Sequence, residues 1–145
     1  LRPWRFIEVT GDGRNKLANA FLNSSKKINH VDEEKEKRIL GLPMRSPMII
    51  VVISEIVDKP NVPRIEQIQS TAAATQNILI ALHDMGYAAY WRTGKYSSEN
   101  NKYIANELSL NTNSEVLGYL YIGTPSKEPK EAPKLNKEDY VTIWE

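Results

Sequence analysis

The chain has 145 residues, of which 41% are hydrophobic and 26% are charged, with a formal net charge of +1 at pH 7. This length suits one domain with a buried core, and the composition is that of an ordinary folded protein, not a disordered one. The small net charge gives no strong field that would attract nucleic acid or an acidic membrane surface, so we expect neither as a partner. Cysteine is absent, which excludes disulfides and thiolate metal sites and is consistent with a reducing cytoplasm.

The first half of the chain predicts two strands and two helices. Residues 4–9 are rich in aromatic and β-branched side chains and predict a strand, after which Asp12 can cap a helix over residues 13–22. A highly charged segment predicts a short exposed helix over residues 32–40. The near-continuous apolar run "PMIIVVISEI" at 47–56 is typical of a strand buried on both faces, and it is too short to span a membrane.

The second half predicts two more helices and two more strands before a polar tail. Apolar residues at helical spacing predict a long helix that starts near Pro63 and is capped by Gly86. Beyond it the pattern predicts a strand at 87–91, a helix from about Ser97 or Ser98 to Leu108, and a strand at 115–125. Strands that alternate with helices indicate an α/β or α+β sheet with helices packed on it.

The two ends of the chain carry expectations of their own. The chain opens on Leu1 and enters strand-like sequence almost at once, so we expect residues 1–145 to form a single domain that lacks an N-terminal segment. At the other end, a Pro- and Lys-rich linker leads to "YVTIW" at 140–144. This apolar end suits a strand that joins a sheet, either that of a partner chain or that of its own domain.

Most signatures of chemistry are missing from the sequence. The "TGDGRNK" segment lacks the third glycine and the Lys-Ser/Thr ending of phosphate loops, and no serine sits in a nucleophile elbow. His30 and His83 have no companions at metal-ligand spacing, so we expect no metal site. We nominate no catalytic side chain.

The segment Trp91-Arg92-Thr93-Gly94 stands out because it follows a predicted strand. Ligands of α/β sheets bind outside the carboxyl ends of strands, and glycine allows a flat ligand to approach the main chain. Arg92 offers a permanent charge and a planar set of donors for an anionic or electron-rich ring edge, and Trp91 could pack against a ring. The alternative is structural: Trp91 fills the core, Arg92 pairs with an acidic neighbour and Gly94 makes a turn.

Five segments in order resemble the nitroreductase family of FMN-dependent flavoproteins, most closely its minimal bacterial subgroup. They are "RPWRF" at 2–6, "RSPMIIVV" at 45–52, "VPRIEQ" at 62–67, "GYAAYWRTG" at 86–94 and "GYLYIGTP" at 118–125. The resemblance implies an α+β fold with a central mixed or antiparallel sheet flanked by helices. It also implies a homodimer in which the C-terminal strand is exchanged between subunits. The family's N-terminal phosphate-binding helix would lie before Leu1.

The resemblance also implies positions for the cofactors. It places Trp91, Arg92, Thr93 and Gly94 at the flavin. A positive group at the flavin's N1–C2 edge would stabilise the reduced ring, and our hypothesis is that Arg92 or Arg5 supplies it. A basic residue after "GTP", Lys127 or Lys130, would meet the FMN phosphate. The segment implied to hold the nicotinamide nucleotide consists of Ala81, Leu82, His83, Asp84, Met85 and Gly86.

The function implied is hydride transfer from NADH or NADPH, through FMN, to a nitroaromatic or quinone-like acceptor. In such an enzyme the cofactor performs the chemistry and the protein binds, orients and tunes it. Two alternatives stay open at the level of sequence. One is another flavin reaction, such as enone reduction, dehalogenation or fragmentation of the flavin itself. The other is a non-catalytic dimeric binding module with the same fold.

Overall fold

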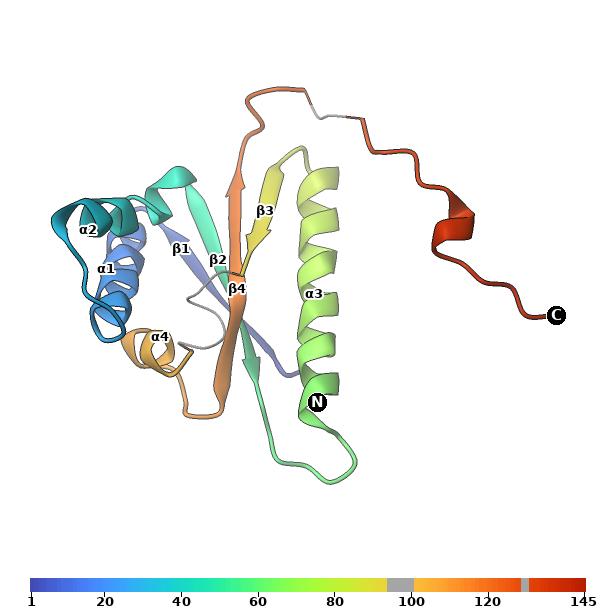
Figure 1. Cartoon of the computed structure of the whole chain (residues 1–145), viewed down its shortest axis with the longest axis horizontal. Coiled ribbons are helices and arrows are strands. Elements are labelled where there is room, and N and C mark those ends of the chain that lie inside the picture. The colour runs from blue at the N-terminus through green and yellow to red at the C-terminus, as the bar shows by residue number, and fades with distance from the viewer. Residues whose placement is uncertain (94–100, 129–130) are drawn as a thin grey trace.

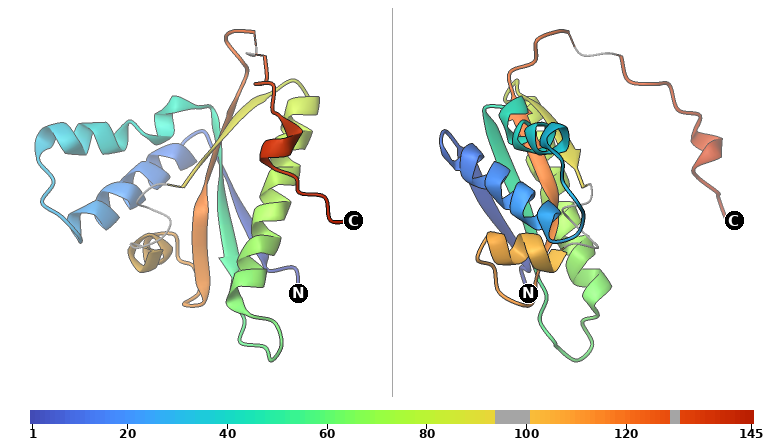
Figure 2. Two further views of the ribbon diagram at one scale, coloured as in Figure 1. Left: turned by 45° about the vertical axis from the view of Figure 1, so that its right-hand side comes forward. Right: turned by 60° about the vertical axis from the view of Figure 1, so that its left-hand side comes forward.

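In the computed structural model of the chain, which describes residues 1–93, 101–128 and 131–145, one four-stranded sheet lies between helices on both sides (Figure 1). Helices α1, α2 and α4 lie on one side of the sheet and α3 lies on the other, as the turned views also show (Figure 2). This confirms the predicted α+β fold. The helices and strands, in chain order, are β1 (Trp4–Thr10), α1 (Gly13–Lys26), α2 (Glu33–Leu40), β2 (Met48–Glu55), α3 (Arg64–Asp84), β3 (Ala88–Arg92), α4 (Asn101–Glu107) and β4 (Ser114–Gly123).

The strands run in the order β1-β2-β4-β3, and every neighbouring pair is antiparallel. Strand β2 is central because it is apolar on both faces: Val51 and Val52, which point to opposite faces, are both fully buried. Strands β1 and β3 form the two edges. Because no strands in the described part of the chain are parallel, the rule that placed a ligand at the carboxyl ends of the strands does not apply here. The surroundings of Arg92 must be argued from its own contacts.

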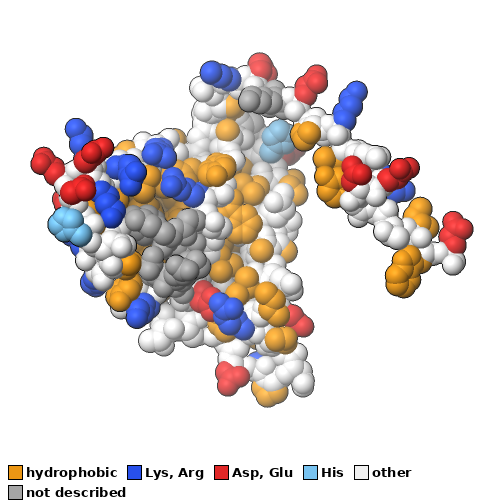
Figure 3. Space-filling model, in the orientation of Figure 1, with side chains coloured by type: hydrophobic (Ala, Val, Ile, Leu, Met, Phe, Trp, Pro, Cys, Tyr) orange, Lys and Arg blue, Asp and Glu red, His pale blue; other side chains and the backbone are white. Residues whose placement is uncertain are grey.

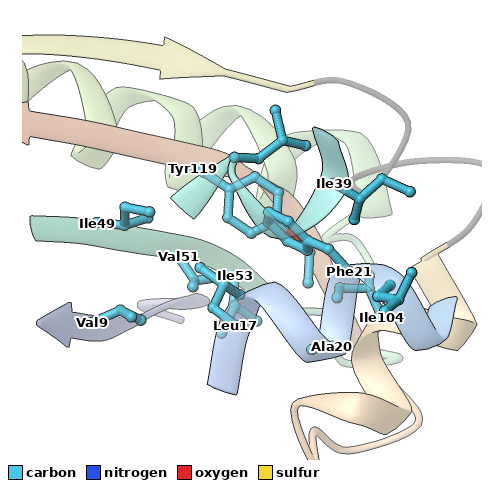
Figure 4. Close-up of a cluster of buried hydrophobic side chains, with 13 residues drawn as sticks. Val9, Leu17, Ala20, Phe21, Ile39, Ile49, Val51, Ile53, Ile104 and Tyr119 are labelled. Carbon is cyan, nitrogen blue, oxygen red and sulfur yellow. The ribbon is translucent and has the colours of Figure 1, made fainter. Parts of the chain in front are cut away.

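The larger core lies between the sheet and the α1 side (Figure 4). Phe21 of α1 and Tyr119 of β4 meet edge to face with ring centroids 5.0 Å apart, a geometry that aromatic pairs favour. Leu17 of α1, Ile53 of β2 and Ile104 of α4 close around them, each at most 2% exposed. The sequence predicted α1 only as far as Leu22, but the helix continues to Lys26 because Ser24 and Ser25 are buried with it.

A polar tie joins α1 to α4 at the rim of this core. Asn23 Nδ2 donates to Glu107 Oε2 at 2.8 Å, and Lys27 Nζ lies 3.2 Å from Glu107 Oε1. The hydrogen bond from Asn23 is the main cause that lowers the pKa of the Glu107 carboxyl, and Lys27 adds to it. The carboxylate therefore helps to hold α4 only while it is ionised.

Helix α3 packs on the sheet through both apolar and polar side chains, and its Ile78, Leu79 and Leu82 contact the smaller apolar core. Its fully buried residues are Gln67, Thr71 and Thr75, spaced one helical turn apart, and Thr71 Oγ1 lies 3.0 Å from Ser54 Oγ of β2. The Gln67 side chain accepts from the Val57 N–H at 3.0 Å and donates to the Val57 carbonyl at 2.9 Å, which fixes the loop before the helix. Apolar residues lie on the outside of the same helix, where Ile65 and Ile80 are 55% and 58% exposed.

Capping hydrogen bonds are present at the start of α2 and the end of α3 but not at the start of α1. Asp32 caps α2 by accepting from the Lys35 N–H at 2.8 Å, whereas Asp12 at the start of α1 makes no capping hydrogen bond, contrary to prediction. At the end of α3, Gly86 has a φ of +82°. Its N–H donates to the His83 carbonyl and the Tyr87 N–H donates to the Leu82 carbonyl, which is the Schellman arrangement. This turn reverses the chain directly into β3.

The C-terminal tail lies away from the sheet (Figures 1 and 2). Residues 140–144 form no strand, and Tyr140, Ile143 and Trp144 are 71%, 68% and 94% exposed. The alternative in which the tail folds back on its own domain is therefore wrong for this chain. The exchange of a C-terminal strand with a partner stays a prediction.

Candidate functional site

Arg92 ends the edge strand β3. It pairs with Tyr119 of β4 in the last step of the β3–β4 ladder, and its side chain is half-buried. Among the residues that the structure describes, no acidic side chain pairs with it, unlike Arg5 and Arg64, which both do. A half-buried guanidinium without a carboxylate partner retains its full capacity for an anionic or electron-rich group.

The side chains of β3 alternate between the two faces of the sheet, and this separates Trp91 from Arg92. Ala89 and Trp91 face α3 and pack against Val52 and Leu120, so the indole is part of the smaller core. Tyr90 and Arg92 face the other side, where Tyr90 is 67% exposed. The structural interpretation thus holds for the Trp91 ring, which does not point to the side of Arg92.

The outer edge of β3 is open within the described part of the chain. Its only strand partner is β4, so alternate main-chain N–H and C=O groups on the other edge have no strand to bond. Thr93 follows the strand and is exposed, while Gly94 lies outside the described residues. The end of β3 can therefore offer main-chain donors together with the Arg92 side chain.

A hollow of about 580 Å³ lies at the opposite, N-terminal end of β3. His83 and Gly86 from the end of α3 line it together with Lys127, which follows β4. Residues predicted for two different ligands, the nicotinamide nucleotide and the FMN phosphate, thus share one hollow. Ala81, Leu82, Asp84 and Met85 belong to the same helix end but do not line it, and Lys130 lies outside the described residues.

The electrostatics of this hollow are set by the end of a helix. The C-terminus of α3 carries partial negative charge, which favours a cation such as Lys127 and disfavours a bare phosphate. The Schellman turn at Gly86 occupies two of the last carbonyls with hydrogen bonds. Lys127 therefore offsets this polarity and provides a cation for an anionic group in the hollow.

Arg5 is not brought near Arg92 within one chain. It lies on β1, the other edge of the sheet, so three strand spacings of about 4.8 Å, or roughly 14 Å in all, separate the two strands. Its guanidinium pairs with Glu55 at 3.1 Å and is exposed. Within one chain, the two candidate arginines for the flavin edge therefore lie on opposite edges of the sheet.

The comparison with known proteins decides the family. The model of the nitroreductase family matches residues 1–124 of the chain. The chain belongs to the nitroreductase family. A curated Haemophilus influenzae protein with a provisional NAD(P)H nitroreductase name is 28% identical over 144 residues, which cover 98% of this chain and 77% of that protein.

Solved structures of nitroreductase-like proteins have the same fold. The nitroreductase-like family protein from Bacillus cereus is 28% identical, with a TM-score of 0.77 over 99% of this chain and 74% of that one. An FMN-dependent nitroreductase from Clostridium difficile R20291 is 24% identical, with a TM-score of 0.63 over 99% and 76% of the two chains. The family match and the Haemophilus influenzae relative support an oxidoreductase, and the solved structures support the fold.

Sequence reasoning did not single out Tyr90. With Ala88 and Ala89 it lines a second hollow of about 320 Å³, whose far wall includes Arg45 and Ser46. Hydrophobic side chains gather along β3 beside α3 on the molecular surface (Figure 3). The sequence signal that could have found Tyr90 is the alternation of side chains along β3. If Trp91 faces the core, its neighbour Tyr90 must face outward.

A third hollow, of about 830 Å³, lies at the end of the sheet where β4 begins. None of the predicted cofactor residues lines it. Arg64 makes two hydrogen bonds to the carboxylate of Glu115 there, and this pairing raises the pKa of the guanidinium. The cation and the carboxylate satisfy each other, so we do not assign the cofactor to this hollow.

The described part of the chain offers no candidate metal site and no candidate membrane span. Within it, no three or more His, Asp or Glu side chains gather in a way that could hold a metal ion. Nor does any helix in these ranges have the length and apolarity that crossing a membrane requires.

Proposed function

We propose that this protein is an FMN-dependent oxidoreductase that carries hydride from NADH or NADPH to a nitroaromatic or quinone-like acceptor. The observation that supports it most is the half-buried Arg92 at the open end of β3, without a carboxylate partner among the described residues of a chain of the nitroreductase family. In the net reaction, NAD(P)H and one proton reduce the oxidised acceptor. The products are NAD(P)⁺ and the acceptor with two added electrons and two added protons. When bound, FMN supplies the two-electron chemistry.

The residues present fit a flavin at the end of β3. A flavin needs hydrogen-bond donors at its pyrimidine edge, and β3 offers main-chain groups along an edge without a strand partner in the described chain. Arg92 adds a positive charge on the same strand. That charge would stabilise negative charge on the ring edge when the ring is reduced, which is an electrostatic contribution from a preorganised group.

The Trp91 main chain, Thr93 and Gly94 belong to the same proposed contact. Thr93 is exposed beside Arg92, so its hydroxyl and N–H are accessible to a ligand. The Trp91 ring would act from the other face, by fixing the strand on the core. Of the two candidate arginines we propose Arg92, because Arg5 is already paired with Glu55 at the far edge of the sheet.

We propose the hollow between α3 and β3 for the nicotinamide nucleotide. His83 and Gly86 line its wall, the segment from Ala81 to Met85 builds the helix end behind them, and Lys127 would face a nucleotide phosphate. A single hollow cannot serve two phosphates on one cation at the end of a helix with negative polarity. The FMN phosphate would then fall to the other predicted lysine, Lys130.

We further propose that the working form is a homodimer in the cytoplasm. The outer face of α3 exposes Ile65 and Ile80, and small residues such as Ala73 would allow close approach of another subunit. The exposed apolar tail, with Trp144 94% exposed, also needs a cover and would supply the exchanged strand. The absence of cysteine is consistent with a reducing compartment.

The test is a visible absorption spectrum of the protein purified from its complete gene, followed by anaerobic addition of NADPH and then NADH. The proposal predicts a flavin band that is bleached by at least one nucleotide and restored by a nitroaromatic or a quinone. A colourless protein that FMN does not tint would contradict the enzyme and favour a binding module of the same fold. A band that neither nucleotide bleaches would contradict the proposed electron donor.

A further inference from the structure

Gly118 occupies an unusual position in the middle of β4. The register between β2 and β4 shifts there: Val52 lies opposite Gly118, whereas Ile53 lies opposite Val116, so Leu117 is an extra residue. This is a β-bulge, and Gly118 adopts a φ of +149°, a backbone conformation that side chains rarely allow. Bulges of this kind bend a strand and redirect the residues beside it.

The end of β3 lies in very close contact with Gly118 of β4. A Cβ atom on Gly118 would lie 2.6 Å from Trp91 Nε1 and 2.7 Å from the Arg92 carbonyl oxygen. Both distances are below any ordinary non-bonded contact, so any side chain at this position must push the end of β3 away. A glycine inside a strand often marks such a close approach of another backbone.

The contact falls on the two residues that the proposed function uses. Trp91 lies over Gly118 with its indole N–H buried, and no hydrogen-bond partner for that N–H is present among the described residues. Arg92 is the last residue of β3, so its position depends on where the strand leaves β4. An indole held by packing alone, with no hydrogen bond to fix it, depends strongly on the space that Gly118 leaves.

We propose that Gly118 is a positioning residue for the flavin site. Its missing side chain leaves the space that the Trp91 indole and the Arg92 carbonyl occupy, and this sets the direction in which the Arg92 guanidinium and the main chain of Thr93 leave the sheet. The inference rests on the proposed function, because it takes the end of β3 as the flavin contact. It adds a residue that makes no contact with the flavin itself.

The test compares Gly118→Ala with Gly41→Ala in a parent protein in which Trp4 and Trp144 are replaced by Phe. Trp91 is then the tryptophan of residues 1–145 that reports by fluorescence. Gly41 is a matched control because its φ is negative and an added Cβ would meet only helix carbonyl oxygens at ordinary distances of 3.5 and 3.6 Å. Three readouts are taken: Trp91 fluorescence, the Kd for FMN, and the midpoint potential of bound flavin. Far-UV circular dichroism checks that each variant is folded.

We expect Gly118→Ala to shift the Trp91 emission, weaken FMN binding by about tenfold to a hundredfold, and move the flavin potential, while Gly41→Ala changes none of these. Trp91→Phe combined with Gly118→Ala should recover part of the affinity, because Phe lacks the nitrogen that meets the new Cβ. A folded Gly118→Ala protein with unchanged Kd and potential would overturn the role of Gly118.

Two further outcomes separate this inference from the proposed function. If the parent protein binds no FMN, the proposed function fails, whatever Gly118 does to the fluorescence of Trp91. If Gly118→Ala does not fold, Trp91→Phe alone carries the test, because it removes the indole from the same contact. Unchanged FMN affinity and potential in that variant would then overturn the inference.

Discussion

The hydroxyl of Thr71 offers a quantitative test of how α3 is held on the sheet. It lies 3.0 Å from Ser54 Oγ and 3.1 Å from the Gln67 carbonyl oxygen, and both Thr71 and Ser54 are 0% exposed. Valine has nearly the same shape, so Thr71→Val opens no cavity. It leaves the Ser54 hydroxyl buried without a partner in the described chain, which costs about 1–3 kcal/mol of unfolding free energy.

Ser54→Ala should relieve that cost. When both partners of a buried hydrogen bond become apolar, the change can be nearly neutral, so the double variant should be more stable than Thr71→Val alone by roughly 1 kcal/mol. Thr75→Val is the matched control, because Thr75 is equally buried and, among the described residues, its hydroxyl bonds only to the Thr71 carbonyl of its own helix, at 2.8 Å. We expect that control to cost about 1 kcal/mol at most.

The assay is equilibrium unfolding in urea, with the midpoint and slope compared across the four variants. Constant slopes would show that only the stability has changed. The reasoning would be refuted if Thr71→Val cost no more than Thr75→Val, or if the effects of Thr71→Val and Ser54→Ala simply added. Either result would mean that Ser54 finds another partner and that the pair does not hold α3.

Three further predictions concern the nucleotide hollow, the outer face of α3 and the α1–α4 tie. Lys127→Ala should raise the KM for the nicotinamide nucleotide about tenfold and leave the Kd for FMN unchanged, whereas a weaker FMN complex would assign this lysine to the FMN phosphate. Ile80→Glu should convert a dimer to a monomer in light scattering, because a charge in an apolar interface is costly. The control Ile28→Glu, which alters an exposed isoleucine outside α3, should leave the dimer intact. Equal masses for the two variants would argue against this interface. The pKa of Glu107 is lowered in the folded state, so the stabilisation by its carboxylate is present above the unfolded-state pKa of about 4.3 and is lost as the pH falls through the folded-state pKa. Glu107→Gln should therefore flatten the pH dependence of the unfolding free energy in that range. An unchanged profile would exclude the carboxylate as a cause of that dependence.

The fold could be predicted from the sequence because its strongest signals are local. The apolar run at 48–53 specifies a central strand, and the helical spacing between Pro63 and Gly86 specifies α3 almost to the residue. The sheet order could not be predicted from such signals, because it depends on contacts between distant strands. The all-antiparallel pairing accordingly removed the strand-end rule that first drew attention to Arg92.

The site was predicted as a segment but not as a geometry. Side chains alternate along β3, so Trp91 and Arg92 lie on opposite faces of the sheet. Which of the two faces the α3 side could be assigned only from the register of the strand. The close contact of Gly118 with Trp91 and Arg92 joins residues that are distant in the sequence, and no local pattern predicts it. The polar inner face of α3 was hidden for a related reason: Thr71 and Thr75 would ordinarily be expected on the solvent side.

The measurement that tests the central claim most directly is the Kd for FMN of Arg92→Ala, with Arg38→Ala, an exposed arginine on α2, as the control. One charge-assisted hydrogen bond is worth about 1.5–3 kcal/mol, so losing the guanidinium should weaken FMN binding by roughly 10-fold to 150-fold. The control should bind FMN as the parent protein does. Equal affinities for Arg92→Ala and the parent protein would contradict the claim that the end of β3 is the flavin site.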